Sequence, residues 1–277
     1  MQDDSLKPVL IDYVDLENVQ KPEIVYKYRS FNKGDIYHDN ILYNNHIYMS
    51  APSDFEDQFD CKNPTRYDIL NEEETKEWIS RKVREQHPKY NDRAVDNLVS
   101  ELQARNKFKD EKWMAEFDEY EWKSYNDLTG IFSVSENSLS EEMWVKYGDN
   151  HKGVCYGFNT NTLIKSCGLG GGGNVIYVPE LPLIHPFDPI MVQATNRVFY
   201  KTDDWAFEQE YRLRTFTRAG RIRIYSDEVL KSVILGKDFD LSQLPIIIEQ
   251  LVLKGRHAKL SKVILIGGEH TVEEIPY

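Results

Sequence analysis

Two glutamates and an arginine stand at alternate positions of one short segment, where they could act on a substrate together. Glu208, Glu210 and Arg212 stand at every second position of residues 205–213, and Phe207, Tyr211 and Leu213 fill alternate positions. This period of two predicts a strand with one apolar face and one charged face. Neighbouring carboxylates repel each other, so a fold that keeps both needs water, a cation or a chemical task for them. The sequence leaves open a catalytic site or a solvated ion pair of Glu210 with Arg212.

A second candidate for chemistry lies near the start of the chain. Arg29 ends a predicted strand over residues 23–30 and is surrounded by aromatic residues, among them Tyr26. Half-buried guanidinium groups usually hold a carboxylate or a phosphate. Arg29 and Tyr26 are therefore candidate ligand-binding residues, and an internal ion pair of Arg29 is the alternative.

Positive charge is concentrated directly after the paired glutamates. Residues 211–223 contain no acidic residue and five arginines, which are Arg212, Arg214, Arg218, Arg221 and Arg223. A turn at 217–220 predicts a hairpin that returns as a strand over 221–225. The arginines would then form a cationic stripe beside the carboxylates, suited to a pyrophosphate or a nucleic-acid acceptor. Neutralisation of the acidic face is the alternative.

The histidines, cysteines and glycines carry weaker signals. His151 lies in a predicted turn at the mouth of a strand, where it is a possible contact for a phosphate or for the acceptor. No pair of histidines has a metal-binding spacing. The three cysteines are odd in number and widely separated, so we expect buried thiols and no structural metal. The glycine run at 167–174 lacks the Gly-Lys-Ser/Thr end of a phosphate-binding loop, and we expect a flexible hairpin loop.

Composition predicts an ordinary soluble globular protein. The chain has 277 residues, 40% of them hydrophobic, which is enough to bury one large core or two modest ones. No segment is apolar for long enough to span a membrane, and the first residues are acidic rather than basic and then apolar, so we expect a cytoplasmic protein without membrane association. The formal net charge of -12 argues against indiscriminate binding to nucleic acid.

The period of the hydrophobic pattern predicts how these residues are positioned. Strands are expected over 23–30, 46–50, 129–135, 153–158, 174–178, 205–213, 221–225, 233–236 and 262–266, with helices near 36–43, over 139–147 and over 242–254. Residues 71–127 instead show helical spacing and form an insertion of two or three helices. We therefore expect a single α+β domain over 1–277, mostly antiparallel, with this insertion between its second and third strands.

Several segments resemble the bacterial family catalogued as domain of unknown function 2971. The resemblance rests on residues 26–30, 47–55, 132–135 and 143–158, and on Lys201 together with 205–213. It covers nearly the whole chain except the helical insertion, and it implies no activity. The chain departs from the family pattern in the loop after Phe55, and at Lys146, where a histidine is usual. The second departure argues against a mechanism that needs a histidine there.

Three of these motifs also resemble, in their order, the signature of ADP-ribosyltransferases: an arginine, then Ser-x-Ser, then Glu-x-Glu. The resemblance implies that Arg29 holds a phosphate of NAD and that Ser133 and Ser135 brace the site. Glu210 would contact the nicotinamide ribose, and Glu208 would orient or deprotonate the acceptor.

General chemistry is consistent with these roles. Breaking the bond between nicotinamide and ribose passes through an oxocarbenium-like state, which a carboxylate such as Glu210 can stabilise. A second carboxylate with a raised pKa, such as Glu208, can act as general base.

The resemblance implies an NAD-dependent ADP-ribosyltransferase or NAD glycohydrolase, acting as an effector of a bacterial toxin or antiphage defence system. NAD would be its substrate, and a protein or a nucleic acid its acceptor. The alternative is a non-catalytic module of a defence system that recognises a nucleotide or a protein. A nuclease is less favoured because no cluster of metal-binding carboxylates with a histidine base is evident.

Overall fold

The fold is built on one large, mostly antiparallel sheet. A computed structural model describes residues 21–277 except 32–35, 58, 106–109 and 216–218. Eight strands form the sheet in the order β12-β11-β10-β4-β1-β3-β8-β5. They are β1 (Ile24–Arg29), β3 (Gly130–Ser135), β4 (Val154–Asn159), β5 (Gly172–Asn174), β8 (Glu210–Thr215), β10 (Leu230–Leu235), β11 (Lys259–Ile266) and β12 (Glu269–Glu274). Among the described strands of this sheet, only β10 and β11 pair in parallel, so the predicted α+β class with a mostly antiparallel sheet is confirmed.

Two small sheets lie beside the large one. Strand β2 (His46–Met49) pairs with β9 (Arg221–Ile224) in antiparallel orientation. Strand β6 (Ile176–Val178) pairs with β7 (Tyr200–Thr202) in parallel orientation.

Helices bury both faces of the large sheet. Residues of α1 (Ile36–Asn44), α6 (Thr160–Cys167) and α8 (Leu244–Leu253) pack in one hydrophobic cluster with β1, β3, β4, β8, β10 and β11. Trp144 and Met143 of α5 (Glu141–Lys146) pack in another cluster with alternate residues of β1, β4, β10 and β11. Helix α7 (Ile190–Val198) packs on β3 through Val198. The core therefore extends along both faces of the central strands, and β4 and β8 are buried nearly throughout.

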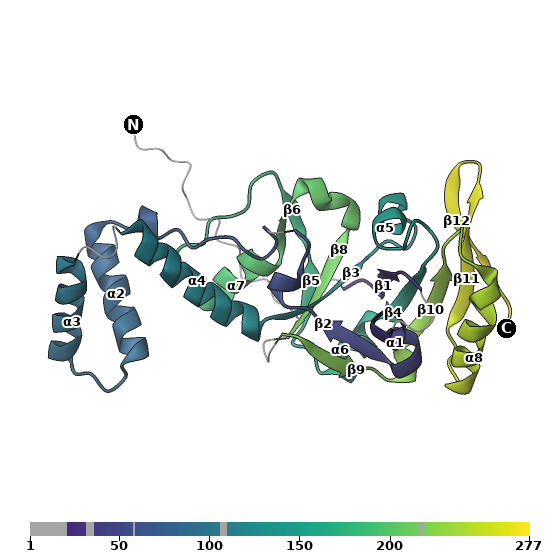
Figure 1. The fold of residues 1–277 in the computed structure, drawn as a ribbon, viewed down its shortest axis with the longest axis horizontal. Coiled ribbons are helices and arrows are strands. Elements are labelled where there is room, and N and C mark those ends of the chain that lie inside the picture. Colours follow the sequence, from purple (N-terminus) through teal and green to yellow (C-terminus); the bar gives the residue numbers. More distant parts are fainter. Residues whose placement is uncertain (1–20, 32–35, 58, 106–109, 216–218) are drawn as a thin grey trace.

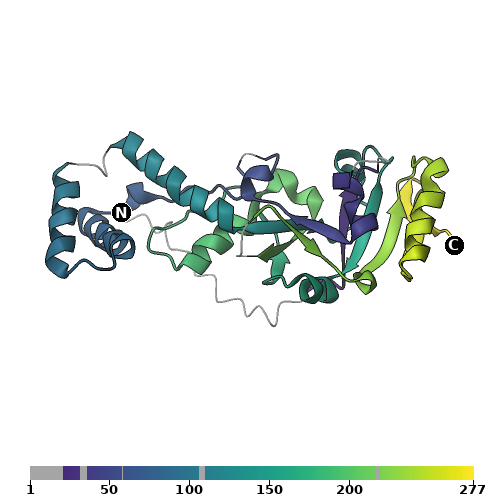
Figure 2. The ribbon, with the colours of Figure 1, turned by 60° about the horizontal axis from the view of Figure 1, so that its bottom comes forward.

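Three helices form the insertion predicted between the second and third strands. They are α2 (Glu72–Gln86), α3 (Asp92–Ala104) and α4 (Glu111–Leu128). Asn71 caps α2 by accepting hydrogen bonds from two backbone amides, as an N-cap residue does. Trp78, Val95 and their neighbours form a hydrophobic cluster separate from those of the sheet. Helices α2 and α3 lie at one end of an elongated molecule, and β12 with α8 lies at the other (Figures 1 and 2).

The strand predicted over 205–213 is only half a strand. Residues Asp203–Glu208 form a short 3-10 helix, and β8 begins at Glu210. Gln209 lies between them with φ at 41°, a left-handed conformation that interrupts any extended segment. The strand predicted from the alternation of charged and apolar residues is therefore confirmed for residues 210–213 and wrong for Glu208, which lies in the 3-10 helix.

The hairpin predicted at 217–220 is also wrong. Strand β8 pairs with β3 and β5, whereas β9 pairs with β2 in a separate sheet. Arg221 and Arg223 thus do not flank the glutamates on a neighbouring strand, and Arg218 lies outside the described residues. Strand pairing depends on contacts distant in sequence, which a local turn pattern does not report.

The glycine run is more ordered than a hairpin loop. Gly168 ends α6 with φ at 60°, and Gly172 begins β5 at the edge of the large sheet. A Cβ atom on Gly172 would lie 2.6 Å from the carbonyl oxygen of Arg212, so only glycine allows this approach. The strand predicted over 174–178 is divided between β5 and β6, which belong to different sheets.

Candidate functional site

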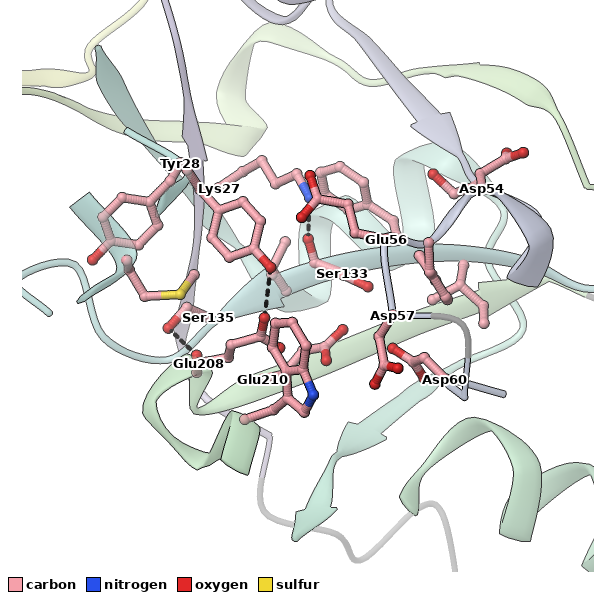
Figure 3. Close-up of a pocket in the computed structure, with 18 of the residues that line it drawn as sticks. Lys27, Tyr28, Asp54, Glu56, Asp57, Asp60, Ser133, Ser135, Glu208 and Glu210 are labelled. Carbon is pink, nitrogen blue, oxygen red and sulfur yellow. Dashed lines mark hydrogen bonds between the residues drawn. The ribbon is translucent and has the colours of Figure 1, made fainter. Parts of the chain in front are cut away.

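A cavity opens where two central strands part. Strands β1 and β3 pair at Tyr26 and Ser135, and beyond this pair Lys27 reaches from β1 to donate a hydrogen bond of 2.7 Å to the carbonyl oxygen of Ser133. The resulting cavity has a volume of about 240 Å³. Its walls come from β1, β3, α5, the loop after β2 and the segment around Glu208 and Glu210 (Figure 3).

The cavity collects six of the residues singled out from the sequence. They are Tyr26, Arg29, Ser133, Ser135, Glu208 and Glu210. The strand order explains the convergence, because β1, β3 and β8 are neighbours in the sheet. Tyr26 lies opposite Ser135, which lies opposite Glu210, and residues opposite each other in antiparallel strands project to the same face. Tyr26, Ser135 and Glu210 therefore form one row across three strands.

Glu210 is an ionised carboxylate held by Arg212. The Arg212 Nε and Nη2 atoms donate to the two carboxylate oxygens over 2.8 and 2.9 Å, and both side chains are almost fully buried. Burial alone would raise the pKa of Glu210. The positive charge and hydrogen bonds of Arg212, with a further contribution from Lys201, outweigh burial and lower the pKa.

Glu208 sits in a different environment two residues away. Its Oε2 accepts from the Lys201 ammonium over 2.7 Å, and its Oε1 accepts from the Tyr147 hydroxyl over 2.6 Å. Ser135 donates to the backbone oxygen of Glu208, also over 2.7 Å. Burial raises the pKa of Glu208, and the charge of Glu210 adds to this effect despite the nearby Lys201. The two glutamates thus have pKa values displaced in opposite directions, as in many acid–base pairs of enzymes.

Asp60 completes the charge network, and sequence reasoning missed it. Its two oxygens accept from Arg212 Nη1 and Nη2 over 2.8 and 2.6 Å, on the other side of the guanidinium from Glu210. Burial would raise the pKa of Asp60, but the charge and hydrogen bonds of Arg212 lower it. The only signal was position, because Asp60 follows the 47–55 segment of the family resemblance.

Lys201 is the second cation of this network. Its Nζ atom lies 2.7 Å from Glu208, 3.4 Å from Asp60 and 3.8 Å from Glu210. It also lies over the Trp205 ring at 4.3 Å from the centroid. Three carboxylates thus surround two buried cations. Lys201 belongs to the segments that resemble the family, but nothing in its local sequence predicted its carboxylate partners.

Acidic residues dominate the cavity walls. The acidic lining residues are Asp54, Glu56, Asp57, Asp60, Glu208 and Glu210, whereas the basic ones are Lys27, Arg29 and Lys201. Figure 3 shows Asp57 and Asp60 of the loop after β2 on the side of the cavity that carries the two glutamates. Such a surplus of carboxylates favours a ligand that presents positive charge to this wall.

The basic residues Lys27 and Arg29 lie on the wall of the cavity formed by β1, which we call the β1 edge of the cavity. Burial and the neighbouring Arg29 lower the pKa of Lys27 to about 7, although Glu210 and Glu208 act in the opposite direction. Lys27 therefore changes charge near neutral pH. An anionic group placed beside Lys27 and Arg29 would favour the charged form of Lys27.

Three residues predicted to contact phosphate or acceptor lie outside the cavity lining. Arg212 is only 1% exposed and is saturated by Asp60, Glu210 and a backbone oxygen, so it is a structural partner of the carboxylates. Arg214 is buried with its guanidinium over the Phe199 ring. His151 does lie in the predicted turn, but it contacts Glu141 elsewhere in the fold. A cationic stripe facing the cavity is therefore not formed by these residues.

The cysteines match the prediction of buried thiols. Cys61, Cys155 and Cys167 are all free and buried. Cys61 lies 3.2 Å from Arg212 beneath the charge network, and burial raises its pKa, so its thiol is not poised to act as a nucleophile.

Comparisons with known proteins locate one family resemblance. The profile of a family described as Protein of unknown function (DUF2971) matches residues 143–213. This segment runs from α5 to the middle of β8 and includes Lys201, Glu208 and Glu210. No curated protein and no solved structure matches the chain, and these comparisons give no support to the resemblance to ADP-ribosyltransferases. Among the described helices, none is long and apolar enough to cross a membrane.

Proposed function

We propose that this protein cleaves the bond between nicotinamide and ribose in NAD and transfers ADP-ribose to an acceptor or to water. The observation that carries the proposal is the presence of Arg29, Ser133, Ser135, Glu208 and Glu210 in the lining of one cavity. These residues come from three sequence regions that have no local reason to meet.

The charge distribution of the cavity supports NAD as the substrate. The nicotinamide ring of NAD is cationic, which suits the acidic wall formed by Glu208, Glu210 and the loop after β2. The pyrophosphate is anionic, which suits Lys27 and Arg29 at the β1 edge. Tyr26 and Trp205 add aromatic surface to the cavity for stacking on a ring.

The proposed reaction uses the two glutamates differently. The C1′–N bond breaks, and its electron pair leaves with nicotinamide. Glu210, kept ionised by Arg212, stabilises the positive charge that develops on the ribose. An oxygen of the acceptor or of water then bonds to C1′, and Glu208, whose pKa is raised, takes the proton. Lys201 and Tyr147 hold Glu208 in position.

We place this activity in an effector of a bacterial toxin or antiphage defence system, as the resemblance to ADP-ribosyltransferases implies. Depletion of NAD, or modification of a protein or nucleic-acid acceptor, would then arrest the host cell.

A Glu210→Gln variant tests the proposal. It should bind NAD in calorimetry but should release nicotinamide about 10²–10³-fold more slowly than the wild type, because the amide lacks the charge that stabilises the transition state. Glu119→Gln, at an exposed position of α4, is the matched control and should behave as the wild type. Turnover by Glu210→Gln at the wild-type rate would refute the role of Glu210.

A non-catalytic recognition module is the second candidate, and one observation favours it. All four carboxylate oxygens of Glu208 and Glu210 already have partners, so neither glutamate needs a ligand to be satisfied. This function predicts that NAD or another nucleotide raises the melting temperature without being consumed. It also predicts that Glu210→Gln keeps full affinity.

A further inference from the structure

A second cluster of polar side chains lies on the other side of α5 from the cavity. Glu141 at the start of α5, His151 in the turn before β4 and His270 in β12 converge there. Helix α5 and the β11–β12 hairpin are neighbours in Figure 1. We propose that these three residues form a binding site for a zinc ion, which links the C-terminal hairpin to α5.

The donor atoms have the spacing of a tetrahedral site. The Nε2 atoms of His151 and His270 lie 3.0 and 3.1 Å from the same oxygen, Oε2 of Glu141. All three donor atoms lie within 4.8 Å of one another. Two ligands that each lie about 2.0–2.1 Å from a tetrahedral zinc ion are about 3.3 Å apart. Small side-chain movements would therefore place all three around one ion.

The ligand types also suit zinc. Two imidazoles and one carboxylate are the protein ligands of many zinc enzymes, in which water takes the fourth position. Hard cations such as calcium and magnesium prefer sites made of oxygen alone. The Glu141 side chain is 52% exposed, so solvent can supply the fourth ligand.

The backbone holds His151 in an unusual conformation. Asp149, Asn150 and His151 all have positive φ angles, between 50° and 66°, although none is glycine. Such conformations persist where the surrounding structure or a function requires them. The imidazole is buried, stacked on Trp144 at 5.6 Å between centroids, and its Nδ1 has no hydrogen-bond partner among the described residues. The ring thus presents Nε2 to the cluster from a fixed position.

The segment directly after β10 packs against the same turn. A Cβ atom on Gly236 would lie 2.0 Å from the carbonyl oxygen of His151, and the Asp238 amide donates to that oxygen over 3.1 Å. His151 therefore cannot move away from Glu141 without displacing the end of β10.

One neighbouring cation must be accommodated. Lys237 Nζ lies 3.6 Å from the second oxygen of Glu141, where it balances the carboxylate when no metal is bound. Its side chain is one-third exposed, so it can turn into solvent when zinc takes over this role. Inspection of the sequence predicted no metal site because residues 141, 151 and 270 share no local spacing.

Zinc titration of the full chain tests the proposal. After treatment with a chelator and dialysis, the wild-type protein should bind one zinc ion per chain in calorimetry, and zinc should raise its melting temperature. Glu141→Gln and His270→Ala should each abolish both effects. The Glu141 side chain is 52% exposed, so Glu141→Gln should melt like the metal-free wild type. The His270 side chain is only 11% exposed, so zinc-induced shifts of His270→Ala are measured against its own metal-free melting temperature.

His257→Ala is the matched control, because it removes an exposed histidine outside the cluster. This variant should bind zinc as the wild type does. The proposal is overturned if the wild type binds no zinc, if His270→Ala binds it with unchanged affinity, or if His257→Ala loses binding to the same extent.

Discussion

Arg212 holds the buried carboxylates of Asp60 and Glu210, and Lys201 holds that of Glu208, so each of the two glutamates has its own cation. The guanidinium of Arg212 pairs with Glu210 on one side and Asp60 on the other. Burying a charge is costly unless it is paired and hydrogen-bonded, and here every carboxylate in the network has a cation within 3 Å. The cluster is thus a structural unit that fixes the glutamates in place.

Removal of Arg212 should therefore destabilise the whole fold. Arg212→Met keeps much of the side-chain volume but leaves Asp60 and Glu210 buried without their main partner. The expected loss is about 3–5 kcal/mol of unfolding free energy, measured by urea denaturation. Arg81→Met, at an exposed ion pair of α2, should cost less than about 1 kcal/mol. Equal losses for the two variants would contradict the assignment of a buried network.

Lys27 should make NAD binding depend on pH near neutrality. Its pKa is lowered to about 7, so the ammonium is charged below that pH and neutral above it. Because the charged form attracts phosphate, the dissociation constant for NAD should rise on the order of tenfold between about pH 6 and pH 8. Lys27→Arg, which stays charged, should bind with little change over this range. A flat profile for the wild type would argue against phosphate binding at the β1 edge.

At the scale of elements, the junction between the 3-10 helix and β8 places the two glutamates. Gln209 adopts φ of 41°, so Glu208 projects from the end of one element and Glu210 from the start of another. Both carboxylates still lie near Lys201, so the two side chains can meet the same cation without belonging to one uninterrupted strand.

Substitutions at Gln209 test this junction. Gln209→Val should destabilise the fold by about 1–2 kcal/mol, because a β-branched residue is disfavoured at positive φ. Gln209→Gly should be neutral or stabilising, since glycine adopts this conformation without strain. Both effects can be read from urea denaturation midpoints. If residues 205–213 formed a continuous strand, valine at position 209 would stabilise it more than glycine would. A variant Gln209→Val that is more stable than Gln209→Gly would therefore contradict the structure.

The elements that sequence reasoning found are those with a strong local period. Strand β1, strand β3 and helices α2–α4 all match predicted segments, because alternation or helical spacing continues over the whole element. Strand β12 was not predicted, since its sequence Glu-His-Thr-Val-Glu-Glu is mostly polar and is a strand only because β11 pairs with it. The predicted pairing of β9 with β8 was wrong because strand pairing depends on contacts between segments that are distant in sequence.

The candidate site shows the same division. Arg29, Ser133 and Glu210 could be singled out because each lies in a recognisable strand and belongs to an ordered set of motifs. Asp60 and Lys201 could not, because their significance lies in contacts with Arg212 and Glu208 across the fold. The cavity itself depends on the divergence of β1 from β3, a tertiary feature without a sequence signature.

At the scale of the whole molecule, the helical insertion has its own core. Among the described residues, the cluster around Trp78, Val95 and Val99 shares no member with the clusters that bury the sheet, although Tyr125 of α4 packs in the cluster around Ile131 of β3. The prediction of one domain over the full chain therefore has a physical alternative, in which the insertion opens independently of the sheet.

Hydrogen exchange can distinguish these two cases. Val99→Ala removes buried methyl groups in the insertion, and Val233→Ala does the same in β10. We expect Val99→Ala to accelerate amide exchange in α2–α4 while the central strands keep their protection, and Val233→Ala to accelerate exchange in the sheet. If either substitution accelerated exchange equally in both regions, the molecule would unfold as a single cooperative unit.

The most direct test of the account is nicotinamide release from NAD by the purified protein, followed by chromatography. The wild type should release nicotinamide, and Glu210→Gln should reduce the rate by about 10²–10³-fold, the usual effect of removing one group that stabilises the transition state. Glu119→Gln should match the wild type. Release of no nicotinamide by the folded wild-type protein, or equal rates for the wild type and Glu210→Gln, would contradict the proposed cleavage of NAD.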